Sequence, residues 1–137
     1  MPTKKKVLVD TCVWIEYFRT TSPISEGLKN LIRSGLAVTI GLVVLELLQG
    51  IKKPADRELI KETILALPLL EATLECWVLA GETGYALRKK GVTLPATDLL
   101  LAATAKKNSC SIFTTDAHFK AIPDLDLYPV RKAPLAP

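Results

Sequence analysis

The chain has 137 residues, of which 49% are hydrophobic and 23% are charged, and its 18 basic and 14 acidic residues give a formal net charge of +4. A chain of this length forms a single domain with a core that needs neither disulfides nor a structural metal. The charge is compatible with nucleic-acid binding but is too small to identify it. The apolar content favours a surface patch that contacts a partner or a second copy of the chain.

Cysteine usage and the first residues bear on the cellular compartment. Cys12, Cys76 and Cys110 are odd in number and lack metal-ligand spacing, which predicts buried thiols in a reducing compartment. After Lys4–Lys6 only three apolar residues precede Asp10, so no secretory or membrane-spanning segment is predicted. We therefore expect a cytoplasmic protein without membrane contact. It consists of one domain over residues 1–130 and a C-terminal tail over 131–137.

The first predicted elements are a buried strand, Val7–Val9, and a helix with apolar spacing over 11–18. Asp10 stands at their junction. In open α/β sheets ligands bind at the carboxyl ends of the strands, which makes Asp10 a candidate site residue. The alternative is that Asp10 only caps the helix, by accepting hydrogen bonds from its free N–H groups.

A second helix is predicted from Pro23, with Ser22 as its N-cap, to a stop at Gly35, and a second short strand at 37–40. The next segment, 42–51, is apolar on every side except at Glu46 and Gln49, which predicts a buried helix. An ionised Glu46 in such a helix needs a cation, a hydrogen bond or an ionic partner. A structural salt bridge or a neutral buried acid is the alternative for this residue.

Two further helices are predicted in the middle of the chain. One runs from Pro54 to Leu67, with its inward positions at Leu59, Ile60, Ile64 and Leu67. The other begins near Leu74 and has one face formed by Trp77, Val78, Gly81 and Tyr85. It ends in the cations Arg88, Lys89 and Lys90, which the helix dipole and solvent explain, although contact with nucleic acid is an alternative.

The last third of the chain repeats the arrangement of strand, acid and helix. A helix over 99–105 is apolar nearly all round, with Asp98 in its first turn and Thr97 able to cap it. The strand 110–113 then runs through Thr114 into Asp116. His118, the only histidine, is predicted to lie on a helix surface or to pack, rather than to act as a base. A half-buried strand is predicted at 125–130, with Pro129 at a strand end or sheet edge.

Alternating strands and helices predict a parallel sheet covered on both faces, with Asp10 and Asp116 at the same sheet edge. Two charges about 4 Å apart repel by about 4 kcal/mol at an effective dielectric of about 20. If Glu46 and Asp98 join them, the cluster therefore needs protons or a divalent cation. Oxygen ligands suit Mg²⁺ or Mn²⁺. One or two such ions orient and activate a water and neutralise charge on a phosphodiester.

Four segments together carry a resemblance to a known family. The sequence around Asp10 (VLVDTCVWI), Glu46 (LELLQG), Asp98 (PATDLLLAATA) and Asp116 (FTTDAHF) resembles the PIN-domain nucleases, in the family's order and over nearly the whole chain. Within that family the chain is most similar to the VapC toxins of toxin–antitoxin pairs. The implied fold is α/β, PIN-like and Rossmann-like, with a central parallel sheet and helices on both faces.

The resemblance implies an endoribonuclease that depends on Mg²⁺ or Mn²⁺. It assigns catalysis and metal binding to Asp10, Glu46, Asp98 and Asp116, with Asp10 and Asp98 as the most direct ligands. Thr114, and with it Thr11, is assigned to hydrogen bonds that hold the carboxylates. The implied partners are RNA, a cognate antitoxin protein and a second copy in a homodimer. Candidate contacts to the RNA backbone are Arg19, Lys52, Lys53, Arg88, Lys89 and Lys90.

Two other functions of small α/β domains do not fit the residues around Asp10. A receiver domain needs paired acids after its first strand, and an Asp-x-Asp phosphatase needs a second aspartate where Cys12 stands, so neither fits. The remaining alternative is a catalytically weak PIN-like module that binds RNA or protein, because a fold does not determine a function. Metal-dependent cleavage of RNA separates the two possibilities, whereas RNA binding alone does not.

Overall fold

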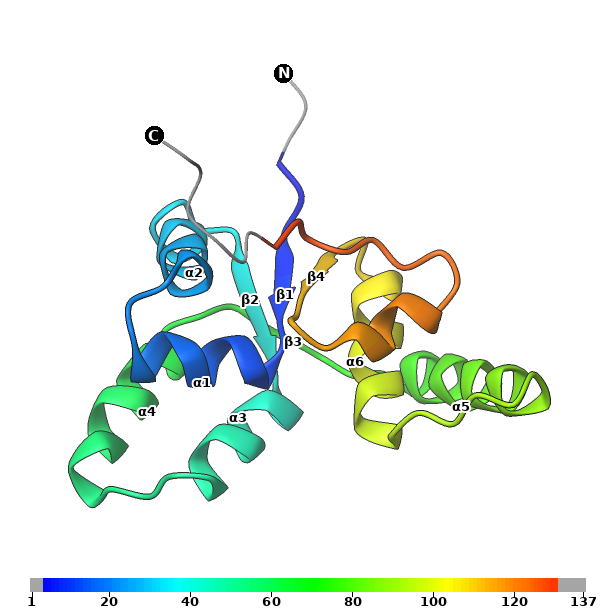
Figure 1. Cartoon of the computed structure of the whole chain (residues 1–137), viewed down its shortest axis with the longest axis horizontal. Coiled ribbons are helices and arrows are strands. Elements are labelled where there is room, and N and C mark those ends of the chain that lie inside the picture. Colours follow the sequence, from blue (N-terminus) through cyan, green and yellow to red (C-terminus); the bar gives the residue numbers. More distant parts are fainter. Residues whose placement is uncertain (1–3, 131–137) are drawn as a thin grey trace.

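The computed structural model describes residues 4–130, in which one parallel sheet stands between two groups of helices (Figure 1). The strands are β1 (Val7–Val9), β2 (Ala37–Ile40), β3 (Leu69–Leu70) and β4 (Ser111–Phe113). The helices are α1 (Thr11–Arg19), α2 (Pro23–Arg33), α3 (Gly41–Gln49), α4 (Arg57–Leu65), α5 (Leu74–Lys89) and α6 (Ala96–Lys107), with 3₁₀ turns η1 (Pro54–Asp56) and η2 (Ala117–Ala121). The predicted tail at 131–137 lies outside the described residues.

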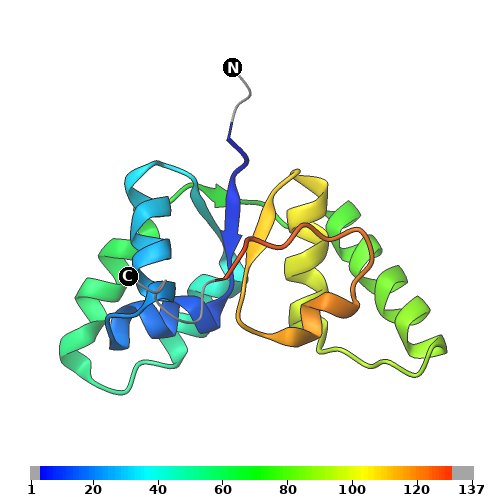
Figure 2. The same cartoon turned by 45° about the horizontal axis from the view of Figure 1, so that its top comes forward.

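The sheet has the order β3-β2-β1-β4, and all its pairings are parallel. Central β1 pairs Leu8 with Val38 of β2 on one side and with Ile112 of β4 on the other. Helices α1 to α4 lie on one side of the sheet and α5 and α6 on the other, and both views agree on this (Figures 1 and 2). This architecture confirms the predicted α/β class, with a central parallel sheet and helices on both faces. It also puts the carboxyl ends of β1 and β4 side by side.

Local signals placed the first helices correctly. Asp10 is the N-cap of α1, and Ser22 forms a capping box with Ser25 at the start of α2, where Pro23 is the first residue. Helix α2 stops before Gly35, whose φ of +73° is a conformation that glycine adopts without strain. Helix α6 is buried at every position from Leu99 to Ala105, as its uniformly apolar sequence predicts.

The prediction that the third helix is buried on all sides was wrong. Only Val43 and Leu47 of α3 are buried, and Leu45 is 57% exposed. The reason is that α3 packs mainly against α4, α1 and β2, and these elements leave the side that carries Leu45 exposed. An apolar sequence shows that every side of a helix could be buried. Which sides are buried depends on the other elements that pack against the helix.

The middle helices also depart from the prediction. Helix α4 begins at Arg57 after a 3₁₀ turn and ends at Leu65, so Leu67 lies beyond it, and Leu59 faces outward with 59% of its surface exposed. The face of α5 that contains Trp77 is the exposed one, because α5 packs against α6 with its other side. There the two helices are so close that a Cβ on Gly84 would lie 2.7 Å from Leu99 Cδ1.

Three smaller features complete the comparison. Strand β3 was not predicted, because two residues after Pro68 are too short to show a period. The strand predicted at 125–130 is reduced to a single bridge between Leu127 and Ile112 of β4. Thr97 does not cap α6, which begins at Ala96 without a side-chain cap. Within residues 4–130 no helix is both long and apolar enough to cross a membrane.

Candidate functional site

The four predicted acids come from four different elements and gather at the carboxyl edge of the sheet. Asp10 directly follows β1, and Asp116 follows β4. Glu46 lies in α3 on one side of the sheet, and Asp98 lies in the first turn of α6 on the other. The charges of Asp10, Asp116 and Glu46 all act on Asp98, which shows that the cluster is shared by all four.

Asp10 is held by donors from its own helix and from β4. Its Oδ1 accepts a hydrogen bond from the Thr11 N–H at 2.7 Å, and its Oδ2 accepts one from the Thr114 hydroxyl at 2.7 Å. The Cys12 thiol lies 3.4 Å from the same Oδ2 and donates to it. The carboxylate is therefore both the cap of α1 and a fixed group at the sheet edge. Its role as a helix cap is therefore compatible with a role as a site residue.

Threonine hydroxyls connect the acids to one another. Thr11 Oγ1 donates to Glu46 Oε1 at 2.9 Å, which joins α1 to α3. Thr114 Oγ1 donates to Asp10 and accepts from the Asp116 N–H at 3.0 Å, which joins β1 to the start of η2. Glu46 is thus partly buried with a neutral hydrogen-bond donor. None of the ion pairs within residues 4–130 involves it.

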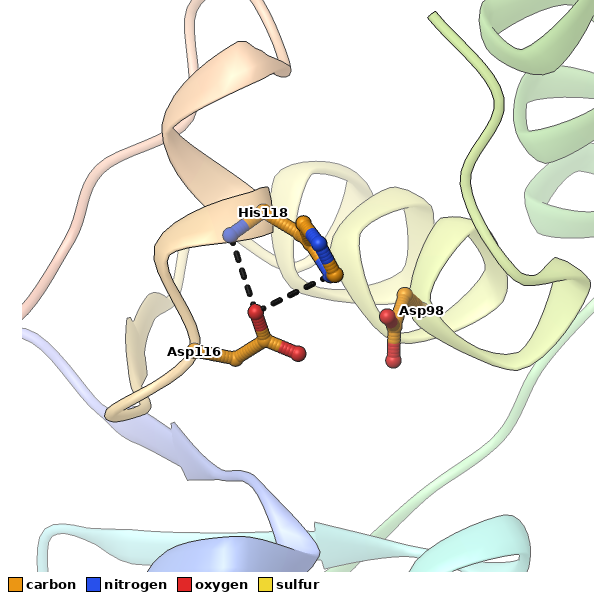
Figure 3. Close-up of side chains that lie close together, drawn as sticks. All are labelled: Asp98, Asp116 and His118. Carbon is orange, nitrogen blue, oxygen red and sulfur yellow. Dashed lines mark hydrogen bonds and ion pairs between the residues drawn. The ribbon is translucent and has the colours of Figure 1, made fainter.

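Asp98, Asp116 and His118 form a compact group (Figure 3). One potential ligand atom from each lies within 4.8 Å of the others. Asp116 Oδ1 accepts from the His118 N–H at 2.9 Å, and His118 Nδ1 lies 3.1 Å from the same oxygen. Asp98 extends from α6 toward this pair. His118 lies on the exposed surface of η2, as the sequence predicts, and its ring and backbone N–H both contact Asp116.

The electrostatics of Asp98 show the cost of this arrangement. Burial raises its pKa most, and the charges of Asp10, Asp116 and Glu46 raise it further, to about 6. Nearby His118 acts in the opposite direction. A carboxyl group whose pKa is raised by three other acids sits in a surplus of negative charge, which a cation would relieve.

The donor set can be tested against a divalent ion. Carboxylate oxygens are the ligands that Mg²⁺ and Mn²⁺ prefer, and no thiolate is among the grouped ligand atoms. Burial, together with the charge of Asp10, raises the pKa of the Cys12 thiol, so Cys12 acts as a neutral donor and not as a thiolate ligand. The residues present therefore fit Mg²⁺ or Mn²⁺, with the imidazole of His118 better suited to Mn²⁺.

The six basic candidates for RNA contact do not form one surface. Arg19, Lys52 and Lys53 line a cavity beside Glu46. Arg88, Lys89 and Lys90 lie at the end of α5, on the opposite side of the sheet. There Lys89 Nζ is 5.0 Å from the centre of the Tyr85 ring, so its ammonium group makes a cation–π contact within the chain.

Two residues at the site were missed because their signals are weak. Cys12 is a single thiol without a paired cysteine, and only its position two residues after Asp10 hints at a contact. His118 follows Asp116 by two residues in a 3₁₀ turn, a spacing that brings its backbone N–H to the carboxylate. Thr11 and Thr114, which the resemblance assigns to hydrogen bonds that hold the carboxylates, donate to Glu46 Oε1 and Asp10 Oδ2 respectively.

Comparisons with known proteins bear on the fold as a whole. The family model for the PIN domain matches residues 7–125. The solved structure of DNA-bound VapBC from Salmonella typhimurium is similar with a TM-score of 0.75 and 19% identity, over 91% of this chain and 98% of that one. The structure of VapBC2 from Rickettsia felis, bound to a promoter DNA fragment, is similar with a TM-score of 0.73 and 22% identity. The match covers 89% of this chain and 96% of that one.

A third structure, a toxin–antitoxin complex from Klebsiella pneumoniae, gives a TM-score of 0.66 and 19% identity, over 86% of this chain and 93% of that one. At these identities the likeness shows a shared fold. Among curated proteins, none matches the sequence.

Proposed function

Because this chain belongs to the PIN domain family, we propose that it is a metal-dependent endoribonuclease and the toxin of a toxin–antitoxin pair. The observation that carries the proposal is the electrostatic state of Asp98. Burial raises its pKa most, and three other acids, each from a different element, raise it further, to about 6. A protein keeps such mutual repulsion at a sheet edge when a cation and a charged substrate make use of it.

The residues that would hold Mg²⁺ or Mn²⁺ are Asp10, Glu46, Asp98 and Asp116. A bound ion of this kind supplies positive charge for a phosphodiester and for the activation of water. Thr11 and Thr114 keep the carboxylates of Glu46 and Asp10 in place through their hydroxyl donors. Asp116 is oriented by two hydrogen bonds. Its carboxylate accepts one from the His118 backbone N–H, and its own backbone N–H donates one to Thr114 Oγ1. These contacts fix acceptor oxygens before any ligand arrives.

The proposed partners are RNA, an antitoxin and a second copy of the chain. The similar solved structures are described as VapBC and as toxin–antitoxin complexes, which supports the antitoxin. Exposed apolar side chains support a protein interface, because a patch of this kind is costly in water. They lie on α3 at Leu45 and on α5 at Leu74, Trp77, Val78 and Tyr85.

A test of the enzyme proposal is cleavage of a structured RNA by the purified chain with Mg²⁺, with Mn²⁺ and with EDTA. We expect cleavage with either ion and none with EDTA. Asp98→Asn should abolish cleavage, because it removes a metal-binding carboxylate and keeps the side-chain shape. The matched control is Asp126→Asn. Asp126 is an exposed acid that pairs with Lys5 just before β1, at the other end of that strand.

The outcomes separate the two candidate functions. Cleavage that needs both the ion and Asp98 supports the nuclease. Equal cleavage by the Asp98 variant and the control would mean that a contaminating enzyme or another site is responsible. Metal binding at the acids without cleavage of varied RNAs would favour the catalytically weak PIN-like module instead.

A further inference from the structure

A cavity of about 500 Å³ lies between α1, α3 and α4, beside the acidic cluster, and Glu46 of that cluster lines it. Its apolar wall is formed by Ile15, Phe18, Leu47, Ile51 and Ile60. Its volume is within the range of sites that enclose a small molecule or one unit of a polymer. The elements that supply it stand together on the side of the sheet away from α5 and α6 (Figure 1).

The rim of this cavity is basic. Arg19 at the end of α1 and Lys52 and Lys53 after α3 all line it, and all three are exposed. Within residues 4–130 none of the three takes part in an ion pair. The acids Glu46 and Asp56 also line the cavity, so the three cations leave a surplus of positive charge, which favours an anionic group beside them.

The cavity adjoins the acidic cluster through Glu46. This residue lines the cavity and also accepts the hydrogen bond from Thr11, next to Asp10. A chain molecule with a phosphodiester at the acids can therefore place its neighbouring unit in the cavity. The wall contains the aromatic ring of Phe18, which stacks with Trp14 at a centroid distance of 6.0 Å and an interplanar angle of 23°.

We propose that this cavity is a subsite for one nucleotide of a single-stranded RNA substrate, next to the phosphodiester that is cleaved. The base contacts the apolar wall with Phe18, and its phosphates contact Arg19, Lys52 and Lys53. Single-stranded RNA is bound in this way, by aromatic and apolar surfaces for bases and by cations for phosphates. The inference rests on the proposed nuclease function and adds where the substrate strand runs.

Charge favours a nucleotide over a protein segment as the occupant. The lining carries the cations Arg19, Lys52 and Lys53 against the carboxylates of Glu46 and Asp56, which leaves a surplus of positive charge. Every nucleotide unit brings a phosphate to that surplus, whereas an apolar helix brings no anion. The carboxylate of Asp56, which also lines the cavity, offers an acceptor for the N–H groups of a base. The cavity thus provides an apolar surface, cations and an acceptor in the combination that a nucleotide requires.

The first experiment measures the affinity of the full chain for a fluorescein-labelled, single-stranded RNA 12-mer in EDTA, where no cleavage occurs. The double variant Lys52→Ala/Lys53→Ala is compared with the control Arg33→Ala/Lys107→Ala. The control removes the same charge from the ends of α2 and α6, at the other edge of the sheet. We expect about a tenfold loss of affinity for the cavity variant and less than twofold for the control.

The salt dependence shows whether the lost contacts are to phosphates. The slope of log affinity against log salt should fall in magnitude by about 0.7 for each phosphate contact removed from a single strand. Phe18→Leu keeps an apolar side chain and loses only the ring, so it should weaken binding about fivefold without changing this slope. The melting temperature of Phe18→Leu is measured as well, to show that this variant is folded. A second variant, Ile15→Asp, adds a negative charge at an exposed position of the cavity wall and should repel the RNA strand.

The proposal is overturned if the cavity variants bind RNA as the control does, or if the unaltered chain fails to bind the 12-mer at low salt. In the first case a protein segment is the better occupant of the cavity. Cleavage assays keep the two proposals apart. Normal cleavage with no effect of the cavity variants leaves the nuclease standing without this subsite. Binding that depends on the cavity but leads to no cleavage leaves the subsite standing without the nuclease.

Discussion

The two halves of the acidic site are built on different principles. Asp10 accepts hydrogen bonds from Thr11, Thr114 and Cys12, so the fold itself satisfies and orients this carboxylate. Asp98 is governed by burial and by three acidic neighbours, and only His118 moves its pKa downward. One half is arranged before a ligand binds, and we propose that a cation completes the other half. A site of this kind combines a fixed anchor with a group whose charge is available for binding.

The largest expected effect comes from removing the same charge in each half. Asp10→Asn should destabilise the metal-free protein by about 1–3 kcal/mol, because charge-assisted hydrogen bonds are lost. Asp98→Asn should instead raise the free energy of unfolding, because it removes repulsion among the acids. Both variants should lose cleavage. Denaturant unfolding in EDTA at pH 7.5 measures the change in the free energy of unfolding for each variant. Changes in the same direction for both variants would contradict the distinction between the halves.

The link between the halves is the Thr114 hydroxyl, and Thr114→Val removes it with little change in shape. Asp10 loses a donor and the Asp116 N–H loses an acceptor. Mutation of a residue that orients a metal ligand typically lowers the metal affinity by about 10–100-fold. We expect the Mn²⁺ affinity of Thr114→Val to fall by that factor. Calorimetric titration gives the value. Thr63→Val, whose hydroxyl bonds only to Leu59 O of its own helix, is the control and should bind Mn²⁺ unchanged.

The raised pKa of Asp98 predicts how stability depends on pH. Its pKa is about 6 in the folded chain, above the ordinary aspartate value of 3.8, so the protonated form favours folding. This contribution is fully present below pH 3.8 and is lost as the pH rises through 6. Between pH 4.5 and 7.5 the metal-free protein should therefore lose more stability than Asp98→Asn does. Denaturation midpoints across that range, with and without Mn²⁺, test this, and parallel curves for the two proteins would refute it.

The smallest expected effect concerns His118. Its ring is largely exposed and lies beside Asp116, so His118→Ala should leave the fold intact. Because imidazole suits Mn²⁺ better than Mg²⁺, we expect affinity for Mn²⁺ to fall severalfold and affinity for Mg²⁺ to change less than twofold. Competition between the two ions, followed by melting temperature, reads out the ratio. An equal loss for both ions would place His118 in a purely structural role.

Much of the local structure was predictable from short stretches of sequence. The cap at Ser22, the stop at Gly35 and the buried run of α6 depend on neighbouring residues and were predicted correctly. The gathering of Asp10 and Asp116 followed from the parallel order of their strands. The exposure of Leu45 and Leu59 could not be predicted, because it depends on which side of each helix another element covers.

The sequence by itself determined the strands and helices that carry the four acids and, through their order, the PIN family. Local propensity and periodicity act over a few residues, so they can be read along the chain. Only the tertiary structure decided that Thr114 bridges Asp10 and Asp116, that His118 joins Asp98, and that a basic-rimmed cavity adjoins Glu46. These features combine residues from different elements. Their distances depend on how the helices pack on the sheet.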